Sequence, residues 1–185
     1  MSAIIYRKSI ICTAFYPFNN RSVNSSMEAI KNLQNVQKVY LDVSINKTPN
    51  EVIDILKEEP DVLILTGEAG SRDYVSIEYV AINHYHATIP DNDGVVITNS
   101  KIKEDGNLAY FSNIDVYELC DHLQKLGFNI RVSLSAGSYI CNLSYYVALN
   151  YVNEHKLKTK VIFVHFPIIE NDNEEIMKNI VSFLS

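Results

Sequence analysis

Cysteines are few in this sequence, and long apolar runs are missing. The three cysteines are odd in number, far apart and free of any C-x-x-C spacing. This pattern fits free thiols in a reducing compartment and gives no zinc signature. No stretch approaches the roughly 20 apolar residues of a membrane span, and the apolar run near the start is too short for a signal peptide. We therefore expect a cytoplasmic protein with no membrane partner.

Basic residues are too scattered to form a surface for nucleic acid. The formal net charge is −6, and no basic stripe is interleaved with aromatic residues. This balance argues against nucleic acid or an anionic membrane as the main partner. Hydrophobic residues make up 47% and charged residues 21% of the 185 residues, which is ordinary for a globular chain with a full-sized core. No repeat, linker or low-complexity segment divides the chain, so we expect a single domain over residues 1–185.

Short apolar runs alternate with helical patterns along the chain. Strands are predicted at residues 9–14, 39–43, 62–65, 75–83, 130–134 and 160–164. Helices are predicted between them, and a last amphipathic helix covers residues 173–184. This alternation, with apolar strands, predicts an α/β fold: a three-layer α/β/α single domain with a mainly parallel open sheet.

Side chains with a hydroxyl or amide group mark the starts of three of these helices. Ser25, Thr48 and Asn113 are the expected N-caps, because such side chains accept hydrogen bonds from first-turn N–H groups.

Polar or aromatic residues follow four of the predicted strands directly. These segments are residues 15–24, 67–73, 135–141 and 165–167. Ligands of open α/β sheets bind at the carboxyl ends of the strands. The sequence therefore predicts that these four segments converge on one site.

Cys141 stands at the start of a predicted helix, after a short strand and several small residues. Unpaired N–H groups and the positive end of a helix dipole favour the thiolate, which is the nucleophilic form. A free cysteine in such a place is more often a small core residue. On this pattern alone, both interpretations stay open.

His165 and Glu78 are the candidate partners of Cys141. His165 follows an apolar strand, where it is either hydrogen-bonded at the strand end or a general base. Glu78 lies among apolar residues, so it either faces solvent or is buried with a partner. If buried, it would orient His165 and stabilise the imidazolium.

Four segments together resemble the pyroglutamyl peptidase I family, also called pyrrolidone carboxyl peptidase. The N-terminal signature corresponds to residues 12–20 and 23–26, the glutamate signature to 67–83 and 89–94, the cysteine signature to 135–142, and the histidine segment to 163–167. The resemblance runs in order over about residues 9 to 168 and is specific because the four segments occur together.

The resemblance implies a cytosolic cysteine peptidase that removes N-terminal pyroglutamate from peptides. Its triad would be Glu78, Cys141 and His165, with no metal and no cofactor. Peptides with N-terminal pyroglutamate would be its partners. Family members form dimers or tetramers, so the resemblance also implies a homodimer or homotetramer.

The resemblance also implies a pocket for the lactam ring. Phe15 and Phe18 stand where the family encloses that ring, and simple core packing under a loop is their alternative role. Asn24 matches a family asparagine near the same loop. Glu68 replaces the family's usual glutamine and adds a charge beside the pocket.

Three departures from the family pattern bear on activity. Asn19-Asn20 replace two glycines in a turn that asparagine tolerates, and Thr88 replaces an arginine near the active site. With Glu68, the loss of that arginine makes the site more acidic, which raises the pKa of a thiol. Two alternatives therefore stay open: a homologue that binds blocked peptide N-termini without cleaving them, and a cysteine hydrolase for a different amide.

Overall fold

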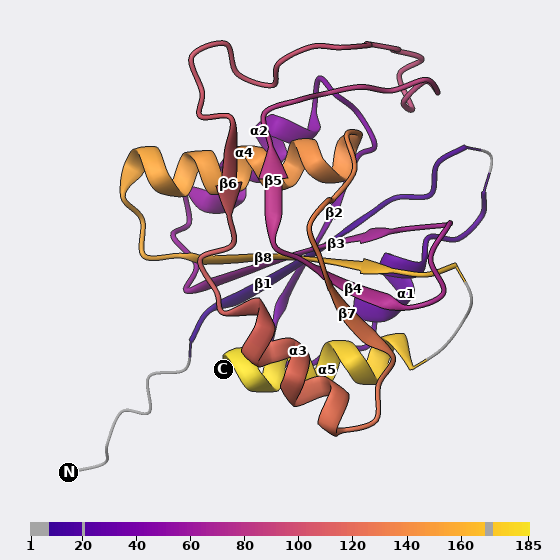
Figure 1. Ribbon diagram of the computed structural model, residues 1–185, viewed down its shortest axis with the longest axis vertical. Coiled ribbons are helices and arrows are strands. Elements are labelled where there is room, and N and C mark those ends of the chain that lie inside the picture. The colour runs from indigo at the N-terminus through magenta and orange to yellow at the C-terminus, as the bar shows by residue number, and fades with distance from the viewer. Residues whose placement is uncertain (1–7, 20, 169–171) are drawn as a thin grey trace.

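A six-stranded sheet forms the centre of the protein, for which a computed structural model describes residues 8–19, 21–168 and 172–185 (Figure 1). The strand order is β2–β1–β3–β8–β4–β7, and neighbours are parallel except for β4 against β8. The mainly parallel sheet expected from the sequence is confirmed. The strands are β1 (Ile10–Phe15), β2 (Gln37–Leu41), β3 (Val62–Glu68), β4 (Val75–Glu78), β7 (Ile130–Ser133) and β8 (Lys160–Phe166).

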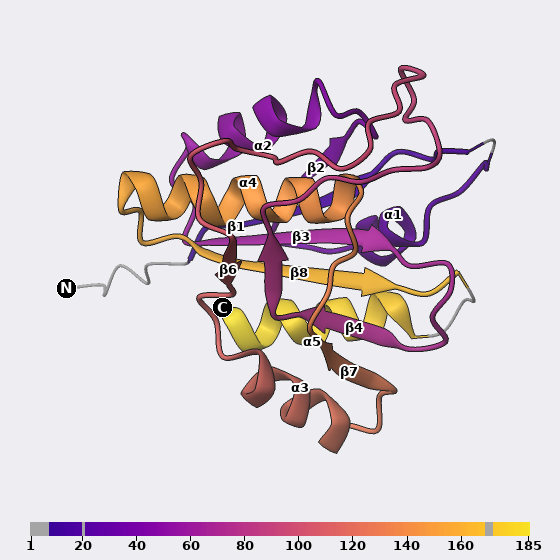
Figure 2. The same ribbon diagram turned by 45° about the horizontal axis from the view of Figure 1, so that its top comes forward.

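Helices cover both faces of this sheet (Figures 1 and 2). One face carries α2 (Thr48–Leu56) and α4 (Ile140–His155). The other face carries α1 (Ser25–Ile30), α3 (Val116–Lys125) and α5 (Asn173–Leu184). The central strands are buried on both faces, which is why their sequences are continuous apolar runs. No helix within the described ranges is long and apolar enough to cross a membrane.

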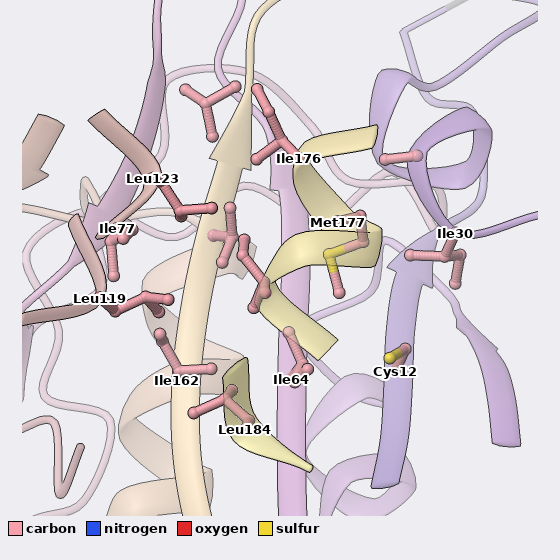
Figure 3. Close-up of a cluster of buried hydrophobic side chains, with 14 of the residues drawn as sticks. Cys12, Ile30, Ile64, Ile77, Leu119, Leu123, Ile162, Ile176, Met177 and Leu184 are labelled. Carbon is pink, nitrogen blue, oxygen red and sulfur yellow. The ribbon is translucent and has the colours of Figure 1, made fainter. Parts of the chain in front are cut away.

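The core under α1, α3 and α5 is almost entirely aliphatic (Figure 3). Ile64 and Ile162 rise from the central strands, and Leu119, Met177 and Ile30 meet them from the three helices. All five side chains are fully buried. The close packing of these side chains holds β3 and β8 in place. The carboxyl ends of these two strands carry the site described below.

The sequence predicts one strand over residues 75–83, and this prediction is wrong. The chain leaves the main sheet after β4, and β5 (Val80–Ile82) pairs with β6 (Ala109–Phe111) in a separate antiparallel sheet. Asn142, fully buried in α4, stabilises the chain where it leaves the main sheet. Its Oδ1 accepts from the N–H of Ile82, and its Nδ2 donates to the carbonyls of Ile82 and His84, all at 2.9 to 3.0 Å. A helix side chain thus satisfies backbone groups that a continued strand would have paired.

The N-caps differ from those expected. Asn24 rather than Ser25 caps α1, and Asp115 rather than Asn113 caps α3, because these side chains accept from first-turn N–H groups. Thr48 is the first residue of α2 rather than its cap.

The tyrosine-rich helix α4 lies inside the molecule, between the sheet and α2. Tyr145, Tyr146 and Leu149 are 0%, 1% and 4% exposed. The hydroxyl of Tyr145 donates to the carbonyl of Glu78 at 3.0 Å, so α4 also pins the end of β4.

Replacing Asn142 by leucine is expected to lower the free energy of unfolding by about 3 kcal/mol or more, because buried backbone groups lose their partners. Urea denaturation measures this. The matched control is Asn153→Ala, at an exposed position of the same helix, which should change stability by less than about 0.5 kcal/mol. Equal stability of the two variants would contradict this account of the β4–β5 departure.

Candidate active site

Strand register brings four residues together on the α4 face of the sheet. His165 pairs with Gly67 of β3 on one side and with Ser76 of β4 on the other, and Glu78 pairs with Phe163. Paired residues of adjacent strands project to the same face, and Phe163 belongs to the core under α4. Gly67, Ser76, Glu78 and His165 therefore share that face.

The strand before Cys141, β7, does not end beside the carboxyl ends of β3 and β8, where the sequence predicts it. β7 is parallel to β4 and so runs opposite to β3 and β8, and Ser133 pairs with Glu78. The loop of residues 134–139 carries the chain back across the face to α4 (Figure 1). Gly137 makes a turn in this loop with φ +81°, a conformation that glycine adopts without steric cost.

The sulfur of Cys141, the second residue of α4, lies against Gly67. A Cβ on Gly67 would stand 2.7 Å from Cys141 Sγ and 3.0 Å from Phe163 Cζ, so only glycine leaves room for the thiol. Gly67 and His165 are register partners, about 5 Å apart across the sheet. The structure therefore places the Cys141 thiol over the strand position next to His165.

His165 and Glu78 form a buried hydrogen bond. His165 Nδ1 lies 2.7 Å from Glu78 Oε1, and the two residues are 4% and 0% exposed. Burial alone would raise the pKa of Glu78, but the hydrogen bond with His165 and the contact with Arg72 hold that pKa below its usual value. Glu78 is therefore a carboxylate that accepts from Nδ1–H, which leaves Nε2 of His165 as the basic nitrogen.

Arg72 also contacts Glu78, and this residue is not among those predicted from the sequence to form the site. Its Nη1 is 2.5 Å from Glu78 Oε1 and also donates to the hydroxyl of Ser76. Its Nη2 donates to the carbonyl of Ser135 at 3.0 Å. A guanidinium beside a buried carboxylate is the signal that only the structure reveals, because residues 69–74 form a loop whose path the sequence does not predict.

Glu68 borders the site as expected, but its charge is already engaged. Its Oε1 forms an ion pair with Arg21, and its Oε2 accepts from the N–H of Ser25 at 2.8 Å and from the hydroxyl of Ser25 at 2.6 Å. The side chain is only 4% exposed. Glu68 thus ties the segment leading into α1 to the end of β3.

A pocket of about 220 Å³ opens over the thiol. It is lined by all the sequence-predicted site residues except Glu78, which lies behind His165, and by residues of the Cys141 loop. These are Phe15, Phe18, Asn24, Glu68, Cys141 and His165, together with Val43, Ala69, Ser71, Arg72, Ala136, Gly137, Ser138, Tyr139 and Ile140.

The walls of the pocket are aromatic at one end. Phe15 is the last residue of β1 rather than a loop residue, and it is 3% exposed. Phe18 lies 6.3 Å from Tyr139 between ring centroids. The hydroxyl of Tyr139 donates to the carbonyl of Pro90 at 3.1 Å, which fixes this wall.

The side-chain oxygen of Asn24 is already hydrogen-bonded within the first turn of α1. Its Oδ1 accepts from the N–H of Ser26 at 3.0 Å and from the hydroxyl of Ser26 at 2.7 Å, so its NH₂ group is the part left to bind a ligand. Asn19 adopts φ +54°, the left-handed conformation expected for a residue in place of glycine, and Asn20 lies outside the described residues. Thr88 is solvent-exposed.

The Cys141 thiol is a weak acid in this site. Burial in the surrounding protein raises its pKa to about 12; Glu78 adds to the rise, Arg72 opposes it, and Glu68 raises it further. The acidic neighbours thus act in the expected direction, but burial has the larger effect and outweighs the helix start. Cys141 is therefore a thiol at neutral pH, and it could act as a nucleophile only if a base removed its proton.

This chain is similar in sequence to known pyroglutamyl peptidases. The model of the pyroglutamyl peptidase family, peptidase family C15, matches residues 8–182. Pyrrolidone-carboxylate peptidase 1 of Caldanaerobacter subterraneus subsp. tengcongensis is 37% identical over 167 residues, which cover 86% of this chain and 82% of that protein. Pyrrolidone-carboxylate peptidase of Thermococcus kodakarensis is 35% identical over 166 residues, covering 85% and 80%.

Solved structures show the same relationship. Pyroglutamyl peptidase I of Bacillus amyloliquefaciens superposes with a TM-score of 0.88 at 27% identity, covering 94% of this chain and 93% of that chain. Pyrrolidone carboxyl peptidase of Fervidobacterium islandicum superposes with a TM-score of 0.85 at 29% identity, covering 96% and 97%. The chain belongs to the pyroglutamyl peptidase family of cysteine peptidases.

Proposed function

We propose that this protein hydrolyses the amide bond that follows an N-terminal pyroglutamyl residue, with Cys141 as the nucleophile. The observation that carries the proposal is the position of the Cys141 sulfur over Gly67, beside the buried His165–Glu78 hydrogen bond. This arrangement opens into a small pocket with aromatic walls. Membership of the pyroglutamyl peptidase family supports the same substrate class.

The pocket matches the chemistry of pyroglutamate. This residue is a flat, uncharged lactam, and Phe15, Phe18 and Tyr139 offer aromatic faces to its ring. The NH₂ group of Asn24 is free to donate to the lactam carbonyl. An ordinary peptide N-terminus carries an ammonium group, which would need an available carboxylate. Glu68 does not supply one, because Arg21 and Ser25 already bind it.

The reaction follows from the order of these groups. His165 Nε2 takes the thiol proton, and the Cys141 sulfur attacks the carbonyl that joins pyroglutamate to the next residue. N–H groups at the start of α4 receive the oxyanion, since a helix start leaves them without intrahelical acceptors. The imidazolium, stabilised by Glu78, then protonates the leaving amine. Water, activated by His165, hydrolyses the thioester and releases pyroglutamate and the thiol.

The family resemblance also supports a cytoplasmic homodimer or homotetramer. Tyr145, Tyr146 and Leu149 are buried in the core, so such an assembly would use other side chains.

Replacing Cys141 by alanine should abolish hydrolysis of a fluorogenic pyroglutamyl amide, with a loss of at least about a thousandfold in kcat, because the nucleophile is gone. Cys120→Ala is the matched control, since this buried cysteine belongs to α3 on the face of the sheet opposite the pocket, and the variant should keep wild-type kcat. Binding of a pyroglutamyl peptide to the wild-type protein without cleavage would contradict the proposal and favour a non-cleaving homologue. Turnover of other acyl amides alone would favour the different-amide hydrolase.

Phe18→Ala should raise KM for the pyroglutamyl amide about tenfold with a smaller change in kcat, because one face of the ring loses its aromatic contact. The control is Tyr16→Ala on the same segment, whose exposed ring packs on Tyr40 instead. Steady-state kinetics of both variants provide the comparison. A wild-type KM in Phe18→Ala would remove this residue from the lactam site.

Gly67→Ala should lower kcat/KM at least about a hundredfold, because the added methyl group displaces the Cys141 sulfur from His165. Activity is measured together with the thermal midpoint, so that loss of folding is separated from loss of alignment. A folded Gly67→Ala variant with wild-type activity would show that the sulfur does not need this position.

A further inference from the structure

We propose that Arg72 is a positioning residue that ties the Glu78 carboxylate to the loop before Cys141 and balances the charge of Glu78. Arg72 is not expected to touch the scissile bond. The kinetic part of this inference rests on the function proposed above.

The first observation is that the guanidinium of Arg72 contacts two separate segments of the chain. One arm, Nη1, binds the Glu78 carboxylate and the Ser76 hydroxyl on β4. The other arm, Nη2, binds the carbonyl of Ser135 in the loop that leads to α4. Because the guanidinium is planar and rigid, it fixes the distance between β4 and this loop.

The second observation is what lies at each end of this connection. Ser76 is the register partner of His165, so Nη1 holds the strand segment that flanks the imidazole. Ser135 precedes the turn at Gly137 and the start of α4, where the oxyanion donors and Cys141 lie. Arg72 therefore couples the position of the base to the position of the nucleophile.

The third observation is the balance of charge around the thiol. The charged and titratable groups facing it are Glu68 at the end of β3, Arg21 on Glu68, Arg72, Glu78 on β4, His165 on β8, and Tyr139 and Tyr145 at α4. Arg21 offsets Glu68, and Arg72 offsets Glu78. Loss of Arg72 leaves the negative charge of Glu78 uncompensated, which disfavours the thiolate of Cys141.

The experiment compares Arg72→Met with the charge-conserving Arg72→Lys, with Arg131→Met as control. Arg131 is an exposed arginine that stacks on Tyr74, 4.2 Å from the ring centroid. Steady-state kinetics on a pyroglutamyl amide are recorded between about pH 5 and 9. Iodoacetamide labelling of Cys141, followed by mass spectrometry at about pH 8, reports thiolate formation without any substrate.

Arg72→Met should lower kcat about tenfold to a hundredfold with KM within about threefold, and move the acid limb of kcat/KM upward by about one pH unit. Arg72→Lys should keep the acid limb of the wild type but still lose about tenfold in kcat, because an ammonium group does not reproduce the two-armed contact. Labelling of Cys141 should slow about tenfold in Arg72→Met and stay within about threefold of wild type in Arg72→Lys. Arg131→Met should match the wild type throughout.

An unchanged kcat and acid limb in Arg72→Met would overturn the proposal. If Arg72→Met does not fold, wild-type kcat in Arg72→Lys would overturn the positioning role by itself. If the wild-type protein does not cleave pyroglutamyl amides, the labelling rates still test the effect of the Arg72 charge on Cys141. Equal labelling of wild type and a folded Arg72→Met would then overturn the charge role, independently of the proposed function.

Discussion

The buried contact between Glu78 and His165 is the interaction on which the rest of the site depends. A carboxylate with no exposed surface is unfavourable unless charge partners and hydrogen bonds surround it. Here the imidazole, the Arg72 guanidinium and the Ser76 hydroxyl all meet Glu78 Oε1. This arrangement keeps Glu78 ionised, holds the proton of His165 on Nδ1, and leaves Nε2 as the basic nitrogen of the imidazole.

Charge pairing explains how the site accommodates a second carboxylate. Glu68 would be a source of repulsion for a thiolate if it stood alone, and it does raise the pKa of the Cys141 thiol. Its contacts with Arg21 and Ser25 connect the end of β3 to the start of α1 and to the loop before it. The pocket is lined both by Glu68 and by the Cys141 loop. The two carboxylates beside the pocket are therefore each paired with an arginine of their own, Glu68 with Arg21 and Glu78 with Arg72.

Much of the site could be predicted from sequence because its parts follow strands or match a family pattern. Cys141, His165 and Glu78 were predicted in this way, and the structure places them close together, with the predicted Phe15 and Phe18 lining the same pocket as Cys141 and His165. The strand break after Glu78 could not be predicted, because residues 75–83 have the partly alternating pattern of a single strand. The side chain that stabilises the break, Asn142, lies in a helix about 60 residues later.

The pKa of the Cys141 thiol likewise could not be predicted from neighbouring residues in the sequence. A helix start favours a thiolate, but burial by the whole fold dominates and makes Cys141 a thiol. The space over Gly67 and the two-armed contact of Arg72 likewise depend on residues distant in sequence. Local patterns selected the candidate groups, and tertiary packing sets their protonation and alignment.

The central claim is that Cys141 attacks the carbonyl of a pyroglutamyl group held in the pocket. A pyroglutamyl aldehyde labelled with ¹³C at the aldehyde carbon tests this directly by NMR. The account predicts a thiohemiacetal signal with the wild-type protein, no such signal with Cys141→Ala, and none with a prolyl aldehyde that lacks the ring carbonyl. An aldehyde that stays free or hydrated in the presence of the folded wild-type protein would contradict the account.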